Sequence, residues 1–278
     1  MDITIPTIPL AQYIDAILDV LTSNFAFVTR AISSATLTGL DYFIAFLMFF
    51  PPVVLILIIS AITYFITSRG VAIFSFLGLL LIWNIGLWAA TMNTLALVIT
   101  ATLIAVGIGL PLGILAALNE RFNRIIMPIL DFMQTMPAFV YLIPAIPFFG
   151  LGAVSAVFAT VIFGMPPAIR LTSLGIRQVP GELIEAANAF GTTWQQKLFK
   201  VQLPMAIPTI MAGINQTIML SLSMVVIAAM IGAGGLGGEV LRAIQRFQPG
   251  KGFEAGLGVV ILAIILDRIT QNIGNKYK

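Results

Sequence analysis

The chain has 278 residues, of which 59% are hydrophobic and only 9% charged, and its formal net charge is +3. Soluble domains carry about 25% charged residues, so this chain lacks the charge to cover a water-facing surface and is expected to lie largely in lipid. It has no Cys and no His, which excludes disulfides, thiolate chemistry, a His-based triad and the usual zinc sites. We therefore expect an all-α integral membrane protein with no metal site.

The N-terminal segment, residues 1–42, is more polar than the rest. It has no basic stretch before an apolar core, so it does not resemble a cleaved signal peptide. Apolar residues recur in it at helical spacing: Leu10, Tyr13, Ile14, Ile17, Leu18 and Leu21. Asp15, Asp19 and Thr22 fall between them. The pattern predicts an amphipathic helix too polar to span, which either lies on the membrane or packs across the bundle, or serves as a scaffold for another subunit.

A helix needs ~20 apolar residues to cross a bilayer. Seven segments are candidates: Phe43–Ile66, Ala72–Trp88, Thr94–Leu118, Ile126–Phe149, Gly152–Leu171, Met205–Ile231 and Ala255–Ile273. Pro51 and Pro52 either kink the first span or mark its true start. Pro137, Pro144 and Pro147 interrupt the fourth, which we expect to be a discontinuous helix.

The basic residues predict an orientation. With seven spans, one side holds ten of them: Arg69, Arg121, Arg124, Arg170, Arg177, Lys197, Lys200, Arg268, Lys276 and Lys278. The other side holds four: Arg30, Arg242, Arg246 and Lys251. The richer side is expected to be cytoplasmic, which puts the N-terminus outside and the C-terminus inside. The chain then divides into residues 1–42, two spans in 43–90, and a transmembrane core in 91–273 with a cytoplasmic loop, 178–204.

Small residues recur at every fourth position in two of the spans. One ridge consists of Ala101, Ala105, Gly109, Gly113 and Ala117, and the other of Gly152, Ala156, Thr160 and Gly164. Lipid gives no hydrophobic drive for helix association, so such ridges predict close packing of helix backbones.

The longest polar interruption is the stretch Glu182–Pro204. Its composition predicts a helix from Glu182 to Phe190, a bend at Gly191, and a second short helix, Trp194–Lys200, capped by Thr192 or Thr193.

This loop has two possible roles when only its chemistry is considered. Its small residues would let a partner approach closely, and Phe190 is an aromatic of the kind that anchors interfaces. Equally, the loop would suit the headgroup region, with Lys197 and Lys200 on lipid phosphates.

The spacing within the loop favours the first role. Glu185-Ala186-Ala187 is followed by Gly191 and then by Val201-Gln202-Leu203-Pro204. This resembles the EAA loop of permease subunits of bacterial ABC importers, where the loop docks on the ATPase subunit. Further segments resemble the glycine betaine/proline-type permeases, so that the resemblance covers most of residues 93–273: Gln134–Ala145, Phe163–Arg170, Gln216–Met230, Gly232–Gly237 and Leu266–Asn272.

The resemblance implies a type I ABC importer permease fold in the bacterial plasma membrane. It implies a non-catalytic homodimer that works with two cytoplasmic ATP-binding subunits and with an external binding protein, expected to be separate because the chain stops at Lys278. ATP and Mg²⁺ would sit on the ATPase, with no cofactor on this chain and no nucleic acid partner. The residues expected to dock on the ATPase are Glu182, Glu185, Ala186, Ala187, Phe190, Gly191, Trp194 and Lys197.

The implied substrate is a quaternary-ammonium osmoprotectant such as glycine betaine, or proline, with choline, carnitine or an amino acid as alternatives. The candidate pathway residues are Met136, Phe139, Tyr141, Asn215, Met219 and Ser223. Aromatic faces attract such cations, although Phe139 and Tyr141 would serve equally as packing. The polar residues of the sixth span either line a gate or form hydrogen bonds between helices. Asp131, near the cytoplasmic end, is expected to meet Arg124 or water.

Gly232, Gly234, Gly235 and Gly237 follow the sixth span and predict a tight turn with positive φ at the external gate. This run lacks the Lys-Ser/Thr of a P-loop, so it is not an ATP site. Two other classes stay open: an ion-coupled secondary transporter, although no internal repeat is evident, and a membrane scaffold or channel that does not pump.

Overall fold

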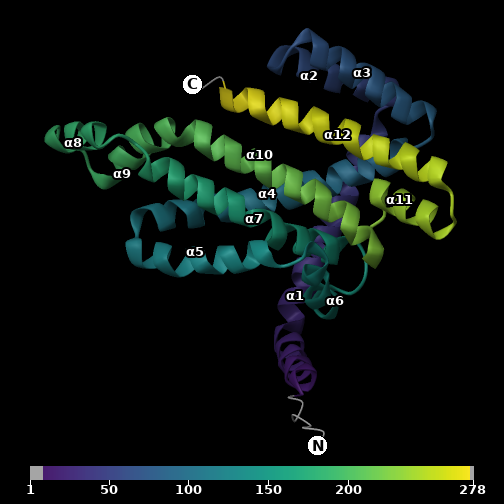
Figure 1. The fold of residues 1–278 in the computed structure, drawn as a ribbon, viewed down its shortest axis with the longest axis horizontal. Helices are drawn as coiled ribbons and strands as arrows, with labels where there is room; N and C mark the ends of the chain where they lie inside the picture. Colours follow the sequence, from purple (N-terminus) through teal and green to yellow (C-terminus); the bar gives the residue numbers. More distant parts are fainter. Residues whose placement is uncertain (1–8, 276–278) are drawn as a thin grey trace, which may run out of the picture.

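The computed structural model describes residues 9–275, and their regular structure is helical (Figure 1). The α-helices are α1 (Leu10–Phe49), α2 (Pro52–Ile66), α3 (Arg69–Asn84), α4 (Trp88–Leu118), α5 (Glu120–Thr135), α6 (Leu142–Phe149), α7 (Ala153–Arg177), α8 (Gly181–Ala189), α9 (Trp194–Lys197), α10 (Leu203–Ile227), α11 (Gly235–Gln245) and α12 (Pro249–Asn275). Three shorter elements join them: the 3₁₀ turns η1 (Ala138–Tyr141) and η3 (Ala228–Ile231) and the π-helical η2 (Leu198–Gln202). Lys276 and Lys278, used in the orientation argument, lie outside the described residues.

Several helices are long and apolar enough to cross a membrane. They are α1, α4, α7 and the continuous helical stretch Trp194–Ile231, to which the bent pair of α5 with α6 adds a broken span. α12 has 27 residues and contains the predicted span 255–273. α2 and α3 have only 15 and 16 residues, about 24 Å each, so neither covers a ~30 Å hydrocarbon core when straight. The count of seven spans and the sides of the termini stay predictions.

The predicted first span, Phe43–Ile66, is wrong as a single helix. α1 continues through residue 43 to Phe49, Phe50 is extended, and α2 begins at Pro52. A residue before proline is pushed out of the helical region, and Pro52 suits the first turn of a helix. Of the two alternatives, a kink or the true start of a helix, the second is correct: the prolines mark the start of α2. The boundary predicted at residue 42 falls inside α1, which runs across the other helices and contacts α4 and α6 (Figure 1). Because α1 continues into the apolar residues up to Phe49, it is long and apolar enough to cross a membrane, contrary to the prediction of a helix too polar to span.

The fourth span is discontinuous, as predicted. α5 ends at Thr135, Met136 is extended, and the axis turns by 111° before α6. The break falls at Pro137, whose ring excludes helix for the residue before it. Pro144 and Pro147 do not break the chain, because both lie inside the short α6.

The core consists of α4, α7 and α10, which run side by side (Figure 1). The predicted small-residue ridges form their contacts. A β-carbon on Gly113 of α4 would lie 2.7 Å from the Ile169 carbonyl oxygen of α7. A β-carbon on Gly164 of α7 would lie 3.0 Å from the Ser221 hydroxyl of α10. The ridges therefore let these backbones approach closely, which is the packing that stabilises helix bundles in lipid.

Candidate functional site

The polar loop projects from one end of the bundle, where α8 and α9 lie (Figure 1). α8 ends at Ala189, and Gly191 follows in the left-handed region with φ +70°. The Thr192 hydroxyl donates to the Ala187 carbonyl at 2.7 Å and closes the bend. The predicted first helix and the bend at Gly191 are confirmed, because only glycine adopts this φ without strain.

The second helix of the loop begins with a capping box. The Thr193 hydroxyl accepts from the Gln196 amide, and the Gln196 side chain accepts from the Thr193 amide. Thr193, one of the two predicted caps, therefore starts α9. Lys197 Nζ donates to Asn188 Oδ1 at 3.0 Å and so ties α9 to α8. The two helices of the loop form one connected unit.

The second helix is not short, and this part of the prediction is wrong. α9 continues through η2 directly into α10, so that Trp194–Ile231 is one helical stretch of 38 residues. The widened turn, in which the Leu203 amide bonds back to Leu198, comes immediately before Pro204. Proline lacks an N–H and clashes with the carbonyl four residues earlier, and a wider turn relieves both effects. A displacement of α9 is therefore carried directly into a core helix.

The base of the loop is fastened to the bundle. Leu198 is buried with Ile176 of α7 and Ala206 of α10. The Arg177 guanidinium at the end of α7 donates to the Ala116 carbonyl of α4 at 2.8 Å and lies 3.8 Å from the Glu120 carboxylate of α5. The base of the loop is therefore packed against α7 and α10, and the end of α7 is held to α4 and α5.

The outward surface of the loop carries most of the predicted docking residues. Phe190 is 89% exposed and Trp194 62% exposed, on either side of Gly191. Glu182, Glu185, Ala186 and Gly191 are also exposed, and Lys197 is half-buried. Ala187 does not lie on this surface, because it is buried beneath the bend that its carbonyl closes. Phe190 and Trp194 are large, exposed aromatic residues with small residues around them. They form an apolar surface that no described part of the chain covers.

The two aromatics of the broken span have different environments. Tyr141 is buried, its hydroxyl donates to the Met133 carbonyl, and its ring lies edge-on to Phe163 at 5.6 Å. Packing, one of the two roles considered, therefore accounts for Tyr141. Phe139 is 57% exposed, and Met136 lies half-buried at the break itself. Of these two aromatics, only Phe139 has an exposed ring, and its role in a substrate pathway stays a prediction.

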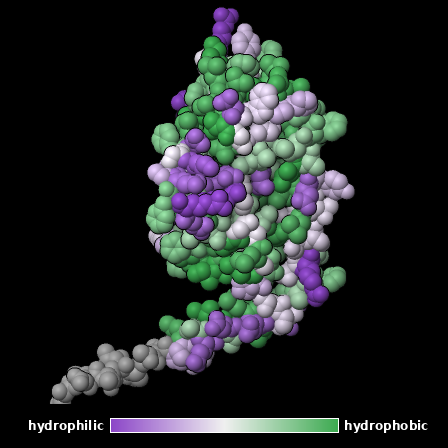
Figure 2. All heavy atoms as spheres, turned by 90° about the vertical axis from the view of Figure 1, so that its right-hand side faces the viewer, coloured by the Kyte–Doolittle hydropathy of each residue, from purple (hydrophilic) through white to green (hydrophobic). Residues whose placement is uncertain are grey.

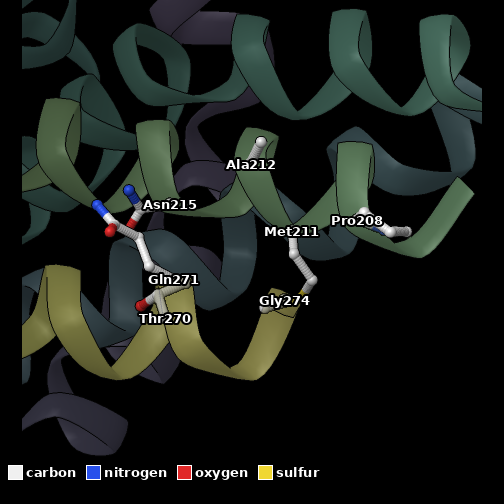
Figure 3. Close-up of a pocket in the computed structure, with 7 residues that line it drawn as sticks. All are labelled: Pro208, Met211, Ala212, Asn215, Thr270, Gln271 and Gly274. Carbon is white, nitrogen blue, oxygen red and sulfur yellow. The ribbon is translucent and has the colours of Figure 1, made fainter. Parts of the chain in front are cut away.

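The polar residues of α10 are only partly hydrogen-bonded within the described residues: Asn215 and Ser223 donate to protein oxygens, whereas the buried Thr217 and Ser221 hydroxyls have no partner there. Asn215 Nδ2 donates to Asp267 Oδ1 of α12 at 2.9 Å, and Gln271 Nε2 donates to the same oxygen at 2.6 Å. Asn215 and Gln271 also line a hollow of about 300 Å³ between α10 and α12 (Figure 3). Ser223 is exposed and donates to the Met219 carbonyl of its own helix. Interhelical hydrogen bonding, the alternative to a gate, accounts for Asn215.

Two carboxylates differ from expectation. Asp131 of α5 accepts from the Arg170 guanidinium of α7 at 2.6 Å, so the predicted meeting with Arg124 is wrong, whereas the Asp131 side chain is 63% exposed, as the alternative of water requires. The sequence analysis did not single out Asp267. Its position inside the predicted span 255–273 could have identified it, because carboxylates within membrane spans are functional candidates. Arg124 lies on the same helix but about two turns before Asp131. The packing of α5 on α7 brings Arg170 into contact instead, so tertiary contact decides the partner.

The glycine turn at the other end of the bundle forms as predicted. Gly232, Gly234 and Gly235 have φ of +87°, +76° and +65°. Gly237 is instead helical and lies against α10, where a β-carbon would come 2.7 Å from the Val226 carbonyl oxygen. The Thr94 hydroxyl of α4 accepts from the Leu236 amide at 2.8 Å and fixes the start of α11. The role of this turn as a gate stays a prediction.

Comparisons with known proteins agree with this architecture. Residues 109–278 match the family described as "Binding-protein-dependent transport system inner membrane component". The chain belongs to this family. It is therefore the membrane component of a binding-protein-dependent transport system.

This permease is similar over nearly its whole length to two bacterial proteins. It is 53% identical to the glycine betaine transport system permease protein OpuAB of Bacillus subtilis, over 99% of this chain and 97% of that protein. It is 49% identical to the glycine betaine/proline betaine transport system permease protein ProW of Escherichia coli, over 96% of this chain and 75% of that protein. Near-complete coverage at this identity indicates the same fold from α1 onward.

A solved structure shows the same fold in the core. An inward-facing structure of the MetNI methionine ABC transporter superposes with a TM-score of 0.63 at 23% identity, over 69% of this chain and 96% of that one. The described permease therefore has the fold of an ABC transporter permease, with additional chain beyond the shared core.

Proposed function

We propose that this permease forms the translocation pathway of an ATP-driven importer that takes up glycine betaine or a closely related quaternary-ammonium solute. The observation that carries the proposal is the 53% identity, over nearly the full length of both chains, to a glycine betaine transport system permease. The GbuB relative of Listeria monocytogenes, also 53% identical, is a glycine betaine/carnitine transport permease, so carnitine belongs to the same substrate class.

In the proposed assembly, two copies of the permease sit in the plasma membrane with two cytoplasmic ATP-binding subunits. A separate external binding protein delivers the substrate, and ATP and Mg²⁺ bind the ATPase alone. The N-terminus would lie outside and the C-terminus inside, with the loop of α8 and α9 facing the ATPase. The seven-span topology belongs to this proposal as well.

The loop supports the coupling step of this mechanism. Its exposed aromatics, Phe190 and Trp194, are suited to a partner pocket, since large aromatics dominate interface energetics. Its second helix is continuous with α10, so closure of two ATPase subunits around ATP would turn or shift a core helix rigidly. A rigid displacement of one packed helix is a known means of switching between two arrangements.

The proposal is tested by reconstitution. Proteoliposomes containing the permease and its ATPase are supplied with the binding protein and labelled glycine betaine, and uptake is measured with and without internal ATP. We expect uptake only with ATP and with the binding protein, and competition by proline betaine or carnitine. Uptake driven by an ion gradient without ATP would instead show a secondary transporter.

A further inference from the structure

The end of the bundle opposite the loop of α8 and α9 carries a compact charged surface. It is formed by the turn between α3 and α4, by α11 and by the start of α12 (Figure 1). Figure 2 views this end and shows a hydrophilic patch surrounded by hydrophobic atoms. The patch contains a hollow of about 240 Å³, and we call it the outer basic surface. Its charged lining residues are Glu239, Arg242, Arg246, Lys251 and Glu254.

Two of the three basic residues on the outer basic surface have no carboxylate partner among the described residues. Arg242 is already paired with Glu239 at 2.5 Å. Within residues 9–275, no carboxylate lies within 4.0 Å of Arg246 or Lys251. Arg242, Arg246 and Lys251 are three of the four basic residues expected on the external side, and they lie within the ten residues 242–251. External loops are normally poor in Lys and Arg, so their concentration at one hollow indicates a specific use.

An exposed aromatic stands beside these cations. Phe247, in the turn between α11 and α12, is 92% exposed and has φ +52°, the left-handed region. A bulky residue there is strained by roughly 1–2 kcal/mol, and such strain is concentrated at functional positions. Ile244, which lines the same hollow as Phe247, is 65% exposed, and Phe253 in the first turns of α12 is 75% exposed. A second, mainly apolar hollow of about 560 Å³ adjoins the first and shares Ala243 and Gln248 with it.

We propose that the outer basic surface is the docking site of the external binding protein, which would present acidic side chains to Arg246 and Lys251 and an apolar pocket to Phe247. This rests on the proposed function and adds to it the surface and the chemistry of the partner. Anionic lipid fits the surface less well, because Glu254 lines the same hollow: a protein can place acidic side chains at Arg246 and Lys251 and leave Glu254 clear, whereas a layer of phosphates brings negative charge to all three. A second copy of this chain fits less well too, since it would bring a surface of the same sign.

The test measures binding of the purified, glycine betaine-loaded binding protein of the same importer to the permease–ATPase complex in nanodiscs. The double variant Arg246→Glu/Lys251→Glu should raise the Kd by about tenfold at low salt, and less at high salt, because exposed charge pairs are screened. The control is Arg30→Glu on α1, which reverses one charge, as each substitution of the double variant does, at a basic residue expected on the same side. It should bind like the parent.

Phe247→Gly separates docking from folding. Glycine suits the left-handed φ, so this variant should be at least as stable as the parent in thermal unfolding while binding the partner more weakly. A purely structural role for Phe247 predicts unchanged binding. Assembly of each variant with the ATPase, followed by size-exclusion chromatography, checks that the bundle has folded.

Each outcome is decisive. If the parent binds its partner and the double variant binds it equally well, the docking surface is wrong and the proposed function stands. If the variant effect follows the anionic lipid content of the nanodisc and vanishes in neutral lipid, the surface is a lipid site. If no parent complex binds the partner, the proposed function fails together with this inference.

Discussion

Arg170 of α7 donates to Asp131 of α5 at 2.6 Å, and this ion pair joins the broken span to the core. The side chains are 36% and 63% exposed, so the pair lies on an open side of the bundle. α5 has few other contacts with α7, which makes the pair a principal link between them. Since α5 leads into the break at Pro137, we expect the pair to help position the break.

Exchanging the two charges tests that link. Asp131→Arg or Arg170→Asp alone would place like charges together and lower uptake in proteoliposomes. The double exchange should restore a large part of the rate, with a coupling free energy of about 0.5–1 kcal/mol once exposure is taken into account. Equal uptake by both single variants and the parent would show that the pair does not hold α5.

Gly191 is expected to be required for contact with the ATPase. It has φ +70°, and nothing lies within 4 Å of the position of a β-carbon, so an added side chain would project outward. Gly191→Trp should fold but bind the ATPase weakly and lower substrate-stimulated ATP hydrolysis. Gly191→Asn is the matched control, because asparagine tolerates left-handed φ and is much smaller. Full hydrolysis by the Trp variant would remove the loop from the coupling mechanism.

The charge of the same loop gives an independent prediction. Glu185 is exposed on α8, and Glu185→Lys should weaken ATPase association if its partner is basic, since opposed like charges cost several kcal/mol when buried. Binding of the ATPase in detergent measures the effect. Glu254→Lys, at the opposite end of the bundle, is the control for the charge change. A variant that binds and stimulates the ATPase normally would exclude Glu185 from the interface.

Packing of α4 on α7 should depend on Gly113. A β-carbon there would lie 2.6 Å from Thr172 Cβ, whereas nothing lies within 4 Å of the same position on Gly107 of the same helix. Gly113→Ala should therefore destabilise the permease by about 1–3 kcal/mol through overpacking, and Gly107→Ala should not. Thermal unfolding in detergent compares the two Tm values, and a lower Tm for the Gly107 variant would contradict the assignment.

The glycine turn depends on a hydrogen bond from another helix. Thr94→Val keeps the shape of a buried side chain but leaves the Leu236 amide without its acceptor, at a cost of about 1–3 kcal/mol. Thr91→Val is the control, since that hydroxyl bonds only to Leu87 of its own helix. Hydrogen exchange at α11 should increase in the first variant alone. Equal protection in both would show that the turn holds without Thr94.

Orientation is tested by labelling. The chain has no Cys, so single cysteines can be introduced without background. Gly238→Cys in α11 should react with an impermeant maleimide added outside intact cells, and Gln195→Cys in α9 should react only after the cells are opened. The reverse pattern would invert the proposed topology.

The sequence alone determined the features whose causes are local. The low charge content predicts a membrane protein, Pro137 breaks the fourth span, and Gly191 bends the loop, because each acts through backbone sterics or solvation within a few residues. Small residues at every fourth position also predicted close helix contacts, because the geometry of a single helix places them on one face.

The tertiary structure decided which residues meet across helices. Asp131 pairs with Arg170, 39 residues away, Asn215 with Asp267, 52 residues away, and Leu236 with Thr94, 142 residues away. No local rule selects these partners, because they depend on how whole helices are placed against one another. The predicted short helix Trp194–Lys200 also proved to continue into α10, because the wide turn before Pro204 relieves the clash of the proline ring with the preceding turn.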